Sequence, residues 1–124
     1  MHKCIHPLLL LALATAICGC SATAPTDRPR TKPTPLVSVD AFAAEYREAV
    51  RTVTASLGEN GEKAEEFYAE VETKEDGQII VFHLWHESAF EPQFRNVVGN
   101  PGGKCRDMRY DVGQRKVTQT LFWQ

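Results

Sequence analysis

The sequence predicts an α+β domain in which one N-terminal helix packs on a four-stranded antiparallel sheet, in the order α-β-β-loop-β-β. Two observations support this fold class. Apolar residues recur every three or four positions in one early segment, which is the period of an amphipathic helix. Later segments rich in β-forming residues come in two pairs, and turn-forming residues join the members of each pair. We place the single domain at residues 39–124 of the 124-residue chain.

The helix is expected over residues 40–58, with Asp40 as its N-cap and Gly58 just beyond its last turn. Its apolar residues form one stripe, which would cover a sheet. The stripe consists of Phe42, Tyr46, Ala49, Val50, Val53 and Leu57.

The strands are expected in two hairpins. Residues 65–73 alternate between apolar and polar side chains, and residues 79–86 return after an Asp-Gly turn. Residues 105–111 and 116–123 form the second pair, and residues 87–104 between the hairpins form a long loop. This order of elements is similar to the cystatin-like architecture, in which a meander curls around a helix. The similarity concerns the fold alone and implies no functional residues.

Residues 1–19 have the pattern of a secretory signal peptide, with Lys3 near the start, an apolar run and small residues after it. The end of this segment, ICGC at residues 17–20, resembles the lipobox of bacterial lipoproteins. The one departure is its first cysteine, where that family prefers Ala, Ser or Thr. The resemblance implies cleavage before Cys20, acylation of Cys20 and a firm lipid anchor. Ser21 after the lipidated cysteine resembles an outer-membrane sorting signal. A signal peptide cleaved without lipidation, or an uncleaved anchor, is the alternative.

The mature chain would therefore begin with the lipidated Cys20 and a Pro-rich tether over residues 20–38. The expected location is the bacterial cell envelope, at the outer membrane and facing the periplasm. The formal net charge of −2 argues against nucleic acid as a partner. Charge is nevertheless uneven, because residues 40–91 hold thirteen acids and four bases whereas residues 92–124 hold two acids and six bases. If these charged faces are exposed, they favour a protein partner with a complementary charge pattern. Alternatively, the charges of the two hairpins neutralise each other across the sheet.

Four residues raise the question of catalysis or metal binding. His83 and His86 lie three apart in a predicted strand, so their side chains point to opposite faces and cannot together hold one metal ion. We therefore predict no metal site and no cofactor. Cys105 with either histidine, and Asp107 as the orienting acid, would suit a thiol nucleophile, but a lone cysteine at a strand start is more often a buried apolar residue.

The loop over residues 87–104 is the favoured functional element, because structureless loops of this length in compact domains are usually functional. It holds aromatic and basic residues, which protein interfaces favour. The candidate binding residues are Phe90, Phe94, Arg95, Lys104 and Arg106. We expect a non-enzymatic, protein-binding lipoprotein, such as an inhibitor or immunity-type protein. The alternatives are a structural accessory subunit of an envelope complex, and a thiol-dependent enzyme using Cys105.

Overall fold

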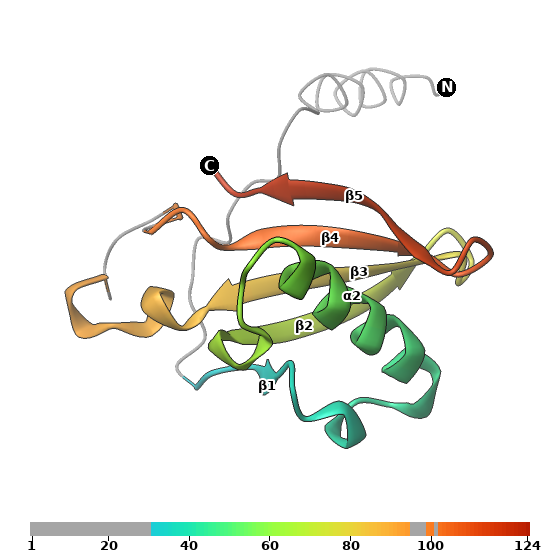
Figure 1. The fold of residues 1–124 in the computed structure, drawn as a ribbon, viewed down its shortest axis with the longest axis horizontal. Helices are drawn as coiled ribbons and strands as arrows, with labels where there is room; N and C mark the ends of the chain where they lie inside the picture. The colour runs from blue at the N-terminus through green and yellow to red at the C-terminus, as the bar shows by residue number, and fades with distance from the viewer. Residues whose placement is uncertain (1–30, 95–98, 101) are drawn as a thin grey trace, which may run out of the picture.

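The structure, a computed structural model, describes residues 31–94, 99–100 and 102–124. Within them one α-helix, α2, lies across one face of a five-stranded antiparallel sheet with the strand order β1-β2-β3-β4-β5 (Figure 1). The α+β class is confirmed, but the sheet has five strands instead of four, and the helix follows the first strand instead of opening the fold. The elements are β1 (Thr34–Pro35), α2 (Arg47–Glu59), β2 (Phe67–Lys74), β3 (Ile79–His86), β4 (Arg106–Asp111) and β5 (Lys116–Phe122).

The additional strand, β1, comes from the segment assigned to the tether. Thr34 and Pro35 pair with the start of β2, and the next residue, Leu36, is 0% exposed in the core. The strand is short because Pro33 and Pro35 have no N–H to donate to a ladder. The same prolines give this segment the composition of a spacer, which is why the sequence does not predict a strand here.

The helix begins later than predicted. Two 3-10 turns, Val39–Ala41 and Ala44–Tyr46, precede Arg47, and the Asp40 side chain caps neither of them. The chain is extended at Phe42 between the turns (φ −89°, ψ 152°), and its ring is buried in the core. A continuous helix from residue 40 is thus replaced by a bend that brings Phe42 into the core.

The end of α2 also differs by a few residues. The helix continues through Gly58, Asn60 is its C-cap, and Gly61 takes the left-handed conformation (φ 78°) that was expected at Gly58. The predicted apolar stripe is confirmed, because the buried residues of α2 are Ala49, Val50, Val53 and Leu57.

Strand β3 lies at the centre of the sheet and is buried on both faces, as its sequence predicts. Phe82 and Leu84 point into the main core under α2. On the other face Trp85 and Trp123 belong to a smaller apolar cluster with Ala89 and Cys105. Each face of the sheet therefore has its own apolar core.

The connection after β3 begins with local structure. Residues Glu87–Phe90 and Pro92–Phe94 form two 3-10 turns that project past the end of β3 (Figure 1). In the part of the chain that the structure describes, no helix is long and apolar enough to cross a membrane.

Candidate protein-binding surface

The end of the sheet where β3 passes into the 3-10 turns holds most of the predicted site residues. His86 is buried there, and its Nδ1 atom accepts a hydrogen bond from the Ser88 N–H at 3.2 Å, so its side chain caps the turn Glu87–Phe90. In the neutral ring the other nitrogen, Nε2, then carries the hydrogen. It donates a hydrogen bond to the Glu66 carboxylate at 3.1 Å. This bond lowers the pKa of Glu66.

Glu66, His86 and Ser88 together form a chain of hydrogen bonds that superficially resembles a serine nucleophile with its base. The Ser88 hydroxyl lies 2.8 Å from Nδ1, but the single lone pair of Nδ1 already accepts the Ser88 N–H. Gly102 also approaches closely, since a Cβ there would lie 3.0 Å from the Ser88 hydroxyl oxygen. His86 therefore caps the 3-10 turn Glu87–Phe90, and Gly102 lies close against the Ser88 hydroxyl.

His83 lies on the opposite face, and its Nδ1 is 2.8 Å from a carboxylate oxygen of Asp107. The same oxygen accepts the Trp123 indole N–H at 2.8 Å. The Nε2 atom of His83 lies 3.6 Å from Glu72. The hydrogen bond to Asp107, aided by the charges of Asp107 and Glu72, raises the pKa of His83 against the opposing effect of burial. The structure thus pairs His83 with Asp107 and His86 with Glu66, on separate faces.

Cys105 is 1% exposed and lies in the smaller core. Its sulfur accepts the backbone N–H of His86 at 3.4 Å, so the contact is with the main chain of that residue. Its neighbours in this core are Trp85, Ala89 and Trp123, so the sulfur is shielded from solvent. This environment is that of an apolar core residue.

Arg106, a candidate binding residue, is 2% exposed. Its guanidinium forms a bidentate salt bridge with Glu62, with N–O distances of 2.6 and 2.5 Å. The guanidinium also lies over the rings of Phe67 and Phe122. The hydrogen bonds from Arg106 lower the pKa of Glu62. The structure therefore places Arg106 inside the fold, where it ties the end of α2 to β4.

The base of the loop is fixed to the sheet at both ends. The Phe90 ring packs against Trp85 and Tyr68, with centroid distances of 5.7 and 5.9 Å. At the other end the Asn100 amide donates to the carbonyls of Cys105 (3.0 Å) and Trp123 (3.1 Å) and accepts the Cys105 N–H (3.0 Å). Both ends of the loop are therefore held by packing and hydrogen bonds to ordered strands.

The remaining candidates lie nearer the surface. Phe94 is partly exposed at the end of the second 3-10 turn, and Lys104 is exposed just before β4. Arg95, like Cys20, the predicted site of lipidation, lies outside the described residues. The described part of the loop thus presents the partly exposed ring of Phe94 and the exposed charge of Lys104.

Sequence reasoning missed Glu62, Glu66, Ser88 and Asn100. The first two lie 44 and 20 residues from the side chains that they bind, so no local spacing could indicate those pairs. Asn100 precedes a Pro-Gly-Gly run and reads as a turn residue, which conceals its three hydrogen bonds to neighbouring strands.

Among the described residues, no group of three or more His, Cys, Asp or Glu side chains is placed to hold a metal ion. Comparison of the chain with protein-family models, curated proteins and solved structures finds no match. The interpretation of function therefore depends on the residues and their geometry.

Proposed function

We propose that this chain is a lipid-anchored protein of the bacterial envelope whose folded domain binds another envelope protein. The observation that carries the proposal is the attachment of the 87–104 loop at both ends, through Phe90 at its start and Asn100 near its finish. A loop whose base is already ordered loses less conformational entropy on binding, which favours affinity. Aromatic and basic side chains at such a base are typical of interface centres.

The polar residues that could suggest catalysis support the same proposal. His83, His86 and Arg106 each bind an acidic partner within the fold, and Cys105 is buried. Because these side chains are bound or buried within the fold, their role in the proposal is to stabilise the loop and the strands that carry it. The proposed contact residues are then Phe94, at the end of the second 3-10 turn, and Lys104, the last residue of the loop, together with Arg95.

The anchor is tested first by metabolic labelling with a palmitate analogue in cells expressing the chain. We expect labelled protein in the membrane fraction, and a Cys20→Ser variant that carries no label. Equal labelling of the Cys20→Ser variant would contradict lipidation at this position.

The binding surface is tested by crosslinking in living cells, mild detergent extraction and mass spectrometry. We expect one dominant partner, and a Phe94→Ser/Lys104→Glu double variant that recovers at least about tenfold less of it, as for an interface centre. A Val112→Ser/Lys116→Glu variant is the matched control, because it makes the same types of change on an exposed turn at the opposite end of the sheet. Equal loss in both variants, or no loss in either, would remove the loop from the interface.

The identity of the captured protein separates the two forms of the proposal. An inhibitor or immunity-type protein should bind its purified target in the absence of other envelope proteins. An accessory subunit should instead remain with a larger complex after extraction and bind no single component alone.

A further inference from the structure

The outer edge of β2 is only partly covered. Strand β1 pairs with Tyr68 and Ala69, whereas β2 continues to Lys74 and pairs with β3 along its whole length. No strand in the described part of the chain pairs with the outer edge of residues 70–74. An uncovered edge of this kind offers backbone groups to another extended chain.

The orientation of the backbone shows which groups are offered. The Leu36 N–H donates to the Phe67 carbonyl at 3.0 Å, so Phe67 directs its backbone groups toward the β1 side. In an antiparallel ladder this direction alternates along the strand. Val71 and Thr73 therefore direct their N–H and C=O groups to the uncovered edge.

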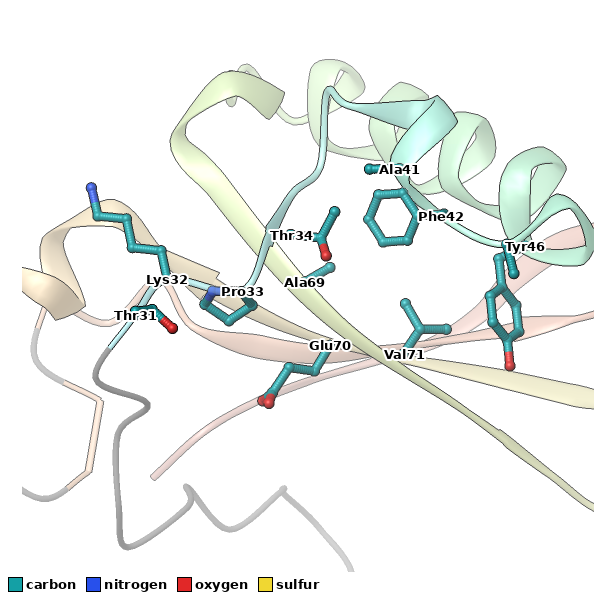
Figure 2. A pocket seen from close by; sticks show the side chains of 11 residues that line it. Thr31, Lys32, Pro33, Thr34, Ala41, Phe42, Tyr46, Ala69, Glu70 and Val71 are labelled. Carbon is teal, nitrogen blue, oxygen red and sulfur yellow. The ribbon is translucent and has the colours of Figure 1, made fainter.

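A groove runs beside this edge. It has a volume of about 400 Å³ and lies between residues 31–34, the start of the helical region and β2. Figure 2 shows Phe42 and Tyr46 on the helix side of β2, beside Ala69 and Val71, whereas Glu70 points away from them. Phe42 is buried, so the partly exposed Tyr46 and Val71 supply most of the apolar surface in a groove that is otherwise polar. A strand edge beside such a groove is open to an extended peptide that adds to the sheet.

The two sides of the groove require different side chains from a ligand. A residue opposite Val71 would lie beside Phe42 and Tyr46 and should be apolar. Residues opposite Glu70 and Glu72 would lie on the other face, where both carboxylates are exposed, and should be basic. Each carboxylate also has a partner within the chain, since Glu70 accepts the Trp85 indole N–H and Glu72 lies 3.3 Å from Lys74. A second copy of this edge would bring the same carboxylates together, and like charges placed opposite each other are unfavourable.

We propose that this edge of β2 binds an extended segment of a protein partner in which Lys or Arg alternates with apolar residues, by addition of a sixth strand to the sheet. This inference goes beyond the loop-mediated binding proposed above, because it uses a different surface and does not depend on Phe94 or Lys104. The ligand pairs through the backbone with Val71 and Thr73, and its basic side chains contact Glu70 and Glu72.

The test uses the full-length chain in non-ionic detergent and a labelled peptide, Thr-Thr-Val-Arg-Val-Lys-Thr, blocked at both ends; its second residue is not basic because it would face Lys74. We expect a saturable rise in fluorescence anisotropy that weakens with added salt, because the charge pairs are exposed. A peptide with Glu at the two basic positions should not bind, and empty micelles report any binding to detergent.

Backbone pairing is tested with N-methylated peptides. Methylation of the two Val residues removes the N–H groups that would face β2, and we expect it to abolish binding. Methylation of Lys or Arg in the same peptide should leave binding nearly unchanged, because those N–H groups face solvent. Equal binding of the two methylated peptides would overturn strand addition.

Variants of the protein locate the site. Thr73→Pro removes an N–H from the uncovered edge and should weaken binding about tenfold, whereas Thr73→Ala keeps it and is the control. Glu72→Gln should weaken binding about two- to fivefold, as for an exposed ion pair. Circular dichroism of each variant verifies the fold. If the peptide does not bind, or binds the folded Thr73→Pro variant as tightly as the original chain, the proposal is wrong; loss of the crosslinked partner in the Phe94 and Lys104 variant bears only on the loop.

Discussion

Strand β3 contributes alternate residues to the two faces of the sheet, and these faces are stabilised in different ways. Under α2 the contacts are mainly apolar, with Phe82 and Leu84 at the centre of the larger core. On the opposite face Trp85 and Trp123 pack edge to face, and each indole N–H donates to a carboxylate, those of Glu70 and Asp107. The helix face therefore combines a large apolar core with the buried Arg106–Glu62 salt bridge, whereas the open face combines a small apolar cluster with charged hydrogen bonds that remain partly accessible to water.

The difference suggests how the two faces divide their roles. An apolar core covered by a helix is suited to carry stability, since burial of large side chains contributes the most free energy. The open face holds the base of the loop in place through Phe90 and Asn100. We expect substitutions on the helix face to unfold the domain, and those on the open face to have smaller effects on stability.

The largest effect is expected for Phe82→Ala, at the centre of the helix face. The ring is 0% exposed, so its removal should lower the free energy of unfolding by about 3–5 kcal/mol. Val81→Ala, on the adjacent buried position of the other face, should cost about half as much or less because fewer atoms are removed. Urea unfolding followed by circular dichroism gives both values; a cost for Phe82→Ala no larger than that for Val81→Ala would contradict the central role of Phe82 in the larger core.

The salt bridge between Arg106 and Glu62 should have the next largest effect. Glu62→Gln leaves the buried guanidinium without its charged partner and should cost about 2–4 kcal/mol, somewhat less than for a fully buried pair because Glu62 is partly exposed. An Arg106→Met/Glu62→Gln double variant should recover part of this loss, since the unpaired buried charge is gone. A double variant less stable than Glu62→Gln would show that the contacts of Arg106 with Phe67 and Phe122 matter more than its charge.

Asp107→Asn tests the open face. It removes the charge that accepts from His83 and Trp123 and should cost about 1–2 kcal/mol near pH 6. The pKa of His83 is raised in the folded chain, so its contribution to stability is present below the unfolded value of about 6.5 and is lost as pH rises through the folded pKa. The cost of Asp107→Asn should accordingly shrink as pH rises through that range.

Titration of His83 by NMR measures this directly. The pKa of His83 should fall in the Asp107→Asn variant, whereas a Glu66→Gln variant, which alters the other histidine, should leave it unchanged. A His83 titration that is the same in Asp107→Asn and in the original chain would show that Asp107 does not cause the raised pKa.

The smallest effect is expected at Cys105. Its thiol should react with a disulfide reagent only after unfolding, because it is 1% exposed between Trp85 and Trp123. Cys105→Ala should lower stability by about 1 kcal/mol and leave partner capture unchanged. Rapid labelling of the folded chain, or loss of function in a folded Cys105→Ala variant, would instead support the thiol-enzyme alternative.

The sequence by itself determined the helix stripe, the two hairpins and the position of the central strand. Residues 79–86 form β3 with the bounds that the sequence predicts, and the buried residues of α2 belong to the predicted stripe. These features are encoded locally, because the period of the apolar residues matches the geometry of each element. The opposite orientation of His83 and His86 follows from the same two-residue period.

Tertiary structure alone decided the fifth strand, the late start of α2 and the burial of Arg106. Strand β1 exists because β2 offers a partner to a Pro-rich segment, and nothing within that segment indicates pairing. Arg106 lies in the fold because Glu62, 44 residues away, satisfies its charge there. A charged side chain is equally compatible with the surface or with a buried pair until its partner is placed, and long-range pairing leaves no periodic trace in the sequence.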